Sequence, residues 1–169
     1  MRPNVSQHDT LVGLLLVQSL LERRSETFFH PFGLTSAQFN ILNLLANHDG
    51  QLDQSALVEM LLVGKSSLSI VITRMVRDGL VRRVEHAKDR RQTVLHLTSK
   101  GNSLWRRILP NYESGVNKVF GALPPPRRKL FLNDLRMLND ALMEDTGNSP
   151  DVSEKHWRSY LFPSRKGGS

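Results

Sequence analysis

The stretch ALVEMLLVGKSSLSIVITRMVRDGLVRRVEHAKDRRQTVLHLT, residues 56–98, decides the fold. It begins with a short amphipathic segment that ends near Leu62, followed by a break at residues 62–64. A second amphipathic segment, rich in Ser, Thr and basic residues, then runs from Lys65 to Asp78. Gly79 favours a helix end there, because glycine readily adopts the left-handed conformation that follows many helices. Two short helices joined by a tight turn indicate a helix-turn-helix.

Two strand-like runs, residues 80–85 and 92–97, follow this pair directly and are rich in Val, Leu and Thr. The tip that connects them is basic. A helix sized for the major groove followed by a basic β-hairpin is typical of a winged helix, which reads duplex DNA.

The positive charge of the chain is concentrated in the same stretch. Nine basic and three acidic side chains give residues 65–100 a charge of +6, whereas residues 1–64 carry −3 and residues 101–169 carry +4. Positive charge concentrated on one element is expected of a protein that binds a polyanion. The chain has no cysteine, which excludes disulfides and thiolate chemistry. Its longest apolar runs are too short to span a bilayer, so we expect a soluble, cytoplasmic protein.

Helices are also expected outside the winged helix. One runs from about Ser6 to Phe29 and is broken by HPFGL (30–34); the next is capped by Thr35 with Gln38. HDGQ (48–51) is predicted to be a loop, with Asp53 capping a short helix. Thr98 is expected to cap a long helix toward residue 122, and a final helix follows the prolines at 124–126.

We therefore predict a mainly α fold with a small β-wing. Residues 1–33 form an N-terminal dimerisation helix, residues 34–100 the winged helix-turn-helix DNA-binding lobe, and residues 101–146 the C-terminal dimerisation helices. Residues 147–169 form a tail that is partly docked. The reason to expect a homodimer is that the first helix and the last two carry more apolar surface than one winged helix can cover.

Three motifs resemble the MarR family of bacterial transcription regulators. They are LTSAQFNILNLL (34–45), the helix-turn-helix from Ser55 to Leu80, and DRRQTVLHLTSKG (89–101). The resemblance implies an obligate dimer whose two winged helices straddle an inverted repeat. The chain departs from the family at Ile70, where a basic or polar residue is common, and in its longer C-terminal tail.

The groove-facing helix carries the first set of predicted DNA contacts: Lys65, Ser66, Ser67, Ser69, Thr73 and Arg74. Serines in a first turn often serve only as caps for unpaired N–H groups. Placed in the major groove, the same hydroxyls and the Lys65 ammonium group would meet base edges and phosphates. We favour DNA contact because the wing follows directly. Arg74 is expected to contact phosphate or to pair with Asp89.

The wing carries the second set: Arg82, Arg83, Lys88, Asp89, Arg90 and Arg91. A basic hairpin tip can be simply a solvated turn, but the minor groove attracts guanidinium groups. We favour Arg91 as the inserted residue, with Arg90 close behind and Asp89 orienting the Arg91 guanidinium. Arg82 and Arg83, on the wing stem, are expected to contact phosphates.

Other functional classes find little support in the sequence. The histidines show no metal-ligand spacing, and no carboxylate pair, phosphate loop or nucleophile motif is found, so we expect no metal, no cofactor and no enzyme. An aromatic cluster, Phe28, Phe29, His30, Phe32 and Phe39, is most simply core. The family resemblance would also let it line a cleft for a small aromatic effector.

The sequence thus favours a dimeric, sequence-specific DNA-binding regulator, with an effector-responsive repressor as the first choice. A winged helix used as a protein–protein interaction module would share the fold but not the charge pattern. A nonspecific, nucleoid-type DNA binder would keep the charge and lose the base contacts.

The wing prediction can be tested at Arg91. Arg91→Ala should weaken operator binding by roughly 1–3 kcal/mol, the scale of a good groove contact, and leave the fold intact. Asp89→Ala should cause a smaller loss, because it frees the guanidinium group without removing it. Affinity measured on one operator duplex checks both variants, and wild-type affinity of Arg91→Ala would disprove insertion by the wing.

Overall fold

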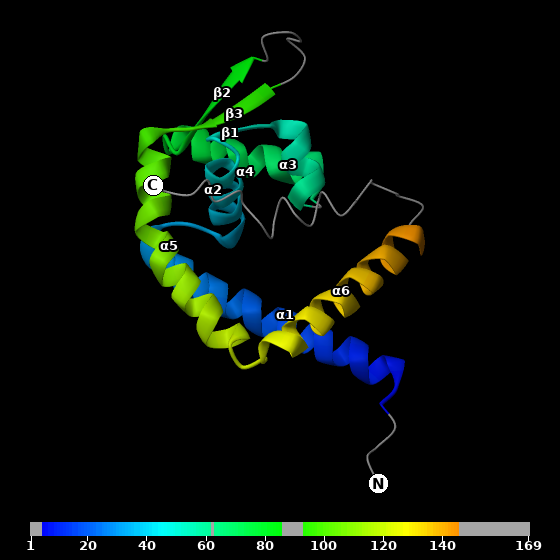
Figure 1. The fold of residues 1–169 in the computed structure, drawn as a ribbon. Helices are drawn as coiled ribbons and strands as arrows, with labels where there is room; N and C mark the ends of the chain where they lie inside the picture. The colour runs from blue at the N-terminus through cyan, green and yellow to red at the C-terminus, as the bar shows by residue number, and fades with distance from the viewer. Residues whose placement is uncertain (1–4, 62, 86–92, 146–169) are drawn as a thin grey trace. The chain divides into compact units, whose positions relative to one another are not determined.

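The computed structural model describes residues 5–61, 63–85 and 93–145 (Figure 1). In chain order its elements are α1 Gln7–Phe29, the 3-10 helix η1 His30–Phe32, α2 Ser36–Asn47, β1 Gln51–Asp53, α3 Gln54–Leu61, α4 Lys65–Arg77, β2 Val81–Glu85, β3 Thr93–Leu97, α5 Ser99–Phe120 and α6 Pro125–Asp145. The predicted mainly α fold with a small β-wing is confirmed. The chain divides into two compact units, Met1–Asn40 and Ile41–Ser169. The tail predicted at 147–169 lies outside the described residues.

Helix α1 begins with a capping box at Ser6, where the sequence predicted the helix to start. The Ser6 hydroxyl accepts a hydrogen bond from the Asp9 N–H at 3.1 Å, and the Ser6 N–H donates to the Asp9 carboxylate at 2.9 Å. The Ser6 hydroxyl also donates to that carboxylate, and these bonds hold the pKa of Asp9 below its usual value. The charged form of Asp9 is therefore the form that the capping box stabilises.

The junction between α1 and α2 follows the sequence signals. Gly33 has a φ of 66°, a left-handed conformation that glycine adopts without steric cost. Thr35 and Gln38 form the predicted capping box: the Thr35 N–H donates to Gln38 Oε1 at 2.9 Å, and the Gln38 N–H donates to Thr35 Oγ1 at 3.2 Å. Gln38 is buried despite its polar side chain, because this bond satisfies its amide oxygen.

The wing belongs to a three-stranded antiparallel sheet with strand order β1-β3-β2. The strands β2 and β3 lie where the sequence predicted them. The prediction of a plain loop at 48–51 was wrong at its end, because Gln51 begins the strand β1 and pairs with His96. A three-residue strand has too few positions to show alternation, so only its pairing with β3 defines it.

A joint of hydrogen bonds connects the end of α4 to the start of α5. Gly79, at φ 70°, ends α4 in a Schellman arrangement in which the Leu80 N–H reaches the Met75 carbonyl at 2.9 Å. The Thr98 hydroxyl, which accepts from the Gly101 N–H at 3.0 Å, shares its proton between the carbonyls of Gly79 at 2.7 Å and Leu80 at 3.0 Å. We call the hydrogen bonds between residues 78–80 and residues 98–101 the α4–α5 joint.

The joint has two further members. The Thr98 N–H donates to the Leu80 carbonyl at 3.2 Å, and Lys100 Nζ donates to the Asp78 carbonyl at 2.8 Å. Carbonyl groups at the end of a helix lack hydrogen-bond partners within the helix. Here the side chains of Thr98 and Lys100, at the start of α5, donate hydrogen bonds to them. The sequence Leu-Thr-Ser-Lys-Gly (97–101) thus has a structural explanation.

The second unit buries its core between the helices and one face of the sheet. Its buried apolar side chains are Ile41, Leu42, Leu44, Leu45, Leu57, Leu68, Ile72, Met75, Leu80, Val81, Leu95 and Ile108. A polar bond joins α5 to α2, because Trp105 Nε1 donates to Asn43 Oδ1 at 3.1 Å. Within the described ranges, no single helix is both long and apolar enough to cross a membrane.

The α4–α5 joint predicts a sharp difference between two glycines of α5. A Cβ at Gly101 would overlap the Leu80 carbonyl oxygen and crowd the Leu97 side chain, whereas a Cβ at Gly115 would meet nothing within 4 Å. Gly101→Ala should therefore lower the free energy of unfolding by about 1–3 kcal/mol or more. Gly115→Ala should leave it unchanged or raise it by about 0.5–1 kcal/mol, since alanine favours helix. Urea denaturation of both variants checks this, and equal stabilities would contradict the role of the joint.

Candidate nucleic-acid interface

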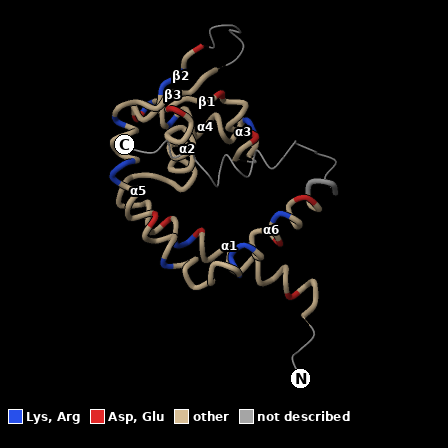
Figure 2. The backbone as a smooth tube through the Cα atoms, in the orientation of Figure 1, with Lys and Arg blue, Asp and Glu red and all other residues tan. Residues whose placement is uncertain are grey.

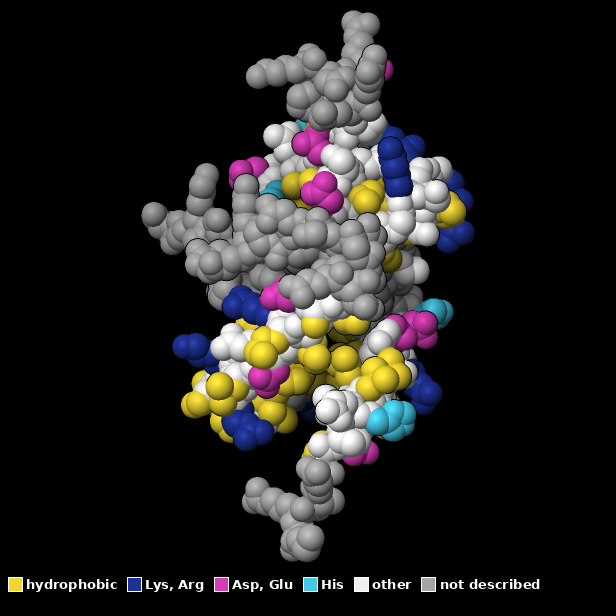
Figure 3. Space-filling view, turned by 90° about the vertical axis from the view of Figure 1, so that its right-hand side faces the viewer, with side chains coloured by type: hydrophobic (Ala, Val, Ile, Leu, Met, Phe, Trp, Pro, Cys, Tyr) yellow, Lys and Arg dark blue, Asp and Glu magenta, His cyan; other side chains and the backbone are white. Residues whose placement is uncertain are grey.

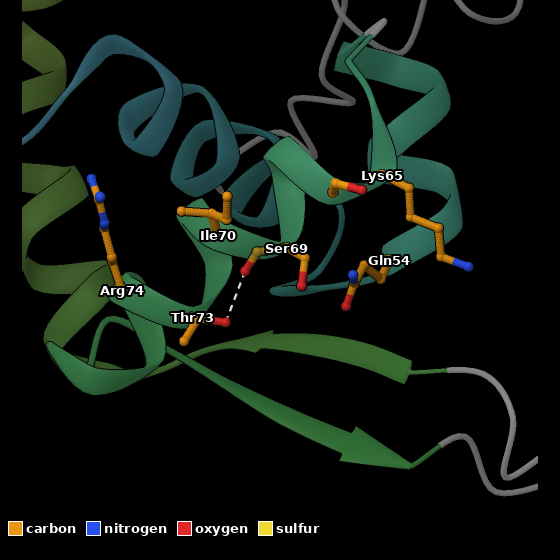
Figure 4. A pocket seen from close by; sticks show the side chains of 7 residues that line it. Gln54, Lys65, Ser69, Ile70, Thr73 and Arg74 are labelled. Atoms are coloured by element: carbon orange, nitrogen blue, oxygen red, sulfur yellow. Dashed lines mark hydrogen bonds between the residues drawn. The ribbon is translucent and has the colours of Figure 1, made fainter.

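The exposed face of α4 forms an open depression with the start of α3. Its lining side chains are Gln54, Lys65, Ser66, Ser69, Ile70, Thr73 and Arg74. Figure 4 shows them gathered along one side of the helix, with Lys65 and Gln54 at one end and Arg74 at the other. The opposite side of α4 is buried in the core through Leu68, Ile72 and Met75. The helix is therefore amphipathic, with a largely polar surface open to a partner.

The first turn of α4 has no side-chain cap. Its N-cap residue is Gly64, and no side chain makes a capping hydrogen bond there. The capping explanation for Ser66 and Ser67 therefore does not hold in this structure. N–H groups and serine hydroxyls at the start of α4 form a surface suited to an acceptor-rich ligand such as a phosphate or a base edge.

The part of the chain that the structure describes places no acidic partner beside the cations of this face. Among the described residues, neither Lys65 nor Arg74 has a carboxylate within ion-pair distance, whereas Arg77 pairs with Asp78 at 3.0 Å at the end of α4. An unpaired ammonium or guanidinium group on a polar surface can exchange counterions for phosphates without first breaking a salt bridge.

Thr73 connects α4 to the wing. Its hydroxyl donates to the Ser69 carbonyl at 2.8 Å and accepts from Arg83 Nη2 at 3.0 Å (Figure 4 shows the first of these bonds). Arg83 thus holds the stem of the wing against the exposed helix in addition to carrying a charge.

The neighbouring arginines of β2 lie on opposite faces of the sheet, because side chains alternate along a strand. Arg83 pairs with Leu95, and Leu95 lies on the buried face; Arg82 pairs with His96 on the other face. Both side chains are exposed, and Figure 2 marks basic residues on β2 in blue. The two arginines therefore have different environments, although the sequence grouped them together.

Most of the residues that were predicted on α4 to contact DNA line the depression: Lys65, Ser66, Ser69, Thr73 and Arg74. Ser67 is exposed but does not line the depression. The wing-tip predictions Lys88, Asp89, Arg90 and Arg91 lie outside the described residues. Gln54 lines the depression and was missed, because it belongs to α3 and only the packing of α3 beside α4 brings it there. The sequence did place Gln54 at the start of the helix before α4, and this position was the one sign that it could reach the depression.

The aromatic cluster is partly core. Phe29 and Phe39 are buried and stack with ring centroids 4.7 Å apart, and Phe28 contacts Phe29 edge-on at 4.9 Å. Phe32 lies against Phe28 at 5.8 Å and is half-buried, whereas His30 is exposed. The cluster therefore stabilises the α1–α2 junction through ring packing.

A helix-turn-helix followed by a strand pair, with a polar, cationic helix face left open, defines a winged helix-turn-helix protein. A sequence profile of the MarR family matches residues 32–92. The transcriptional regulator HosA of Escherichia coli is 30% identical over 123 residues, which cover 72% of this chain and 90% of HosA. The chain belongs to the MarR family of transcription regulators.

Solved structures of similar proteins share the fold. The MarR family regulator Sco3205 of Streptomyces coelicolor, in complex with DNA, superposes with a TM-score of 0.74 at 24% identity, over 82% of this chain and 94% of Sco3205. NadR in complex with 4-hydroxyphenylacetate gives a TM-score of 0.66 at 26% identity, over 80% of this chain and 96% of NadR.

Proposed function

We propose that this regulator binds duplex DNA as a homodimer, with α4 in the major groove of each half of an inverted-repeat operator, and acts as an effector-responsive repressor. The observation that carries the proposal is the exposed face of α4, where Lys65, Arg74 and an uncapped helix start face solvent beside serine hydroxyls. Two neighbouring facts support it: residues 65–100 carry +6, and the similar protein Sco3205 was crystallised with DNA.

A homodimer is supported by the apolar surface that one copy leaves exposed. On α1 the exposed apolar side chains are Leu11, Val12, Leu14, Leu15, Leu16, Val17 and Leu20, and on α6 they are Leu130, Phe131, Met137, Leu138 and Leu142. Exposed apolar side chains are drawn in yellow in Figure 3. Surfaces of this kind commonly mark protein–protein contacts, and a second copy related by a two-fold axis would cover them.

The effector that we propose for this regulator is a small aromatic molecule. Its support is the ring cluster formed by Phe28, Phe29, Phe32 and Phe39, together with the aromatic acid bound by NadR. Binding would regulate the operator by changing the distance between the two recognition helices.

DNA binding should be sequence-specific and strongly dependent on salt. Each phosphate that a cation neutralises adds about −0.9 to the slope of log K against log salt, so Arg74→Ala should make the slope less steep by about that amount if Arg74 contacts a phosphate. Lys118→Ala, which removes an exposed cation on α5, is the matched control and should leave the slope unchanged. Titrations of a selected duplex over a salt series check this. Weak, salt-independent binding to every duplex would instead favour a winged helix that serves as a protein–protein interaction module.

The dimer can be tested without truncating the chain. Leu20 is 63% exposed on α1, so Leu20→Glu should fold normally and weaken the dimer, because it would bury a charge at the interface. Ala37→Glu places the same charge at an exposed position on α2, away from the apolar side chains of α1 and α6, and is the control. Light scattering should report a dimer for wild type and Ala37→Glu and a shift toward monomer for Leu20→Glu. A wild-type monomer at micromolar concentration with operator binding intact would contradict the proposal.

A further inference from the structure

One apolar side chain interrupts the polar face of α4. Ile70 is 57% exposed and lines the depression, whereas Leu68 and Ile72, two residues to either side, are at most 2% exposed. In Figure 4 it lies between Arg74 and Ser69 on the open side of the helix. Ile70 therefore takes no part in the core, and its exposure leaves apolar area that a bound partner would remove from water.

Thr73, three residues further along α4, also lines the depression. Residues three apart lie on the same face of a helix. The Thr73 hydroxyl already donates to Ser69 and accepts from Arg83, so a base would have to compete with both bonds. The γ-methyl group of Thr73 makes no hydrogen bond, and Thr73 is one of the residues that line the depression.

In the major groove, the apolar group on a base edge is the 5-methyl group of thymine; the other groups there are hydrogen-bond donors and acceptors. We propose that Ile70, with a contribution from the Thr73 methyl group, is a specificity-determining contact for a thymine 5-methyl group in each half-site. The inference rests on the proposed function, since it assigns a base to a helix that enters the major groove.

The contact has a measurable size. Burial of one methyl-sized group changes affinity by about fourfold, so replacing the contacted thymine with deoxyuridine, which lacks only the methyl group, should weaken binding by about fourfold per half-site. The replacement should not change the contacts of Lys65 and the serine hydroxyls, because the hydrogen-bonding groups of the base stay the same.

The experiment begins with selection of preferred duplexes from random DNA by the full-length wild-type protein. Affinity is then measured with each thymine of the selected site replaced in turn by deoxyuridine. We expect one position in each half-site to lose about fourfold with wild type and to lose clearly less with Ile70→Ala, in which only the Thr73 methyl group is left. Ile70 is mostly exposed, so this variant should fold normally. Val63→Ala, an exposed apolar position outside the depression, is the control and should keep the wild-type sensitivity to uracil.

Variants of Thr73 separate its two groups. Thr73→Val keeps the methyl group and should keep the sensitivity to uracil; Thr73→Ser keeps the hydroxyl and should reduce it. If selection recovers no preferred duplex, the proposed function fails and this inference fails with it. If a preferred site is found but no thymine is sensitive to uracil, or if Ile70→Ala keeps the full sensitivity, the Ile70 contact is disproved and the proposed function stands.

Discussion

The fold of the winged helix depends on the hydrogen bonds made by the carbonyl groups of Asp78, Gly79 and Leu80. These carbonyl groups end the exposed helix α4, and their partners are the Thr98 and Lys100 side chains and the Thr98 N–H at the start of α5. A buried or half-buried carbonyl without a partner costs free energy comparable to a lost hydrogen bond. One set of bonds therefore fixes the end of α4, the beginning of β2 and the first turn of α5 together.

This joint leaves the polar face of α4 free for a partner. The core holds the opposite face through Leu68, Ile72 and Met75, and the bond from Arg83 to Thr73 adds a second connection between α4 and the wing. A contact surface held by rigid elements loses little conformational entropy on binding. The backbone of this surface is thus held in place by the fold itself.

Features set by neighbouring residues were predictable from the sequence. The start of α1 near Ser6, the caps at Thr35 and Thr98 and the left-handed Gly79 involve partners within a few residues, and each was found as expected. The strand β1 was not predictable, because its register is set by β3, more than 40 residues away.

The lining of the depression shows the same limit. Gln54 belongs to it and Ser67 does not, because membership depends on how α3 packs beside α4 and on the rotation of α4 about its axis. The sequence likewise treated Arg82 and Arg83 as equivalent, whereas the pairing of β2 with β3 places them on opposite faces. Residue type and charge singled out α4 as the element of the candidate site, but tertiary packing decides which side chains line the depression.

The most direct test of α4 as the element that enters the major groove is a photo-crosslink from its first turn. The chain has no cysteine, so Ser66→Cys provides a single thiol for a crosslinker, and Ser114→Cys on α5 provides the control. With a selected duplex at saturation, we expect Ser66→Cys to crosslink to bases at two places about 10 base pairs apart, one turn of DNA, and Ser114→Cys to give none. A saturated complex in which Ser66→Cys crosslinks to no base would show that α4 does not enter the groove.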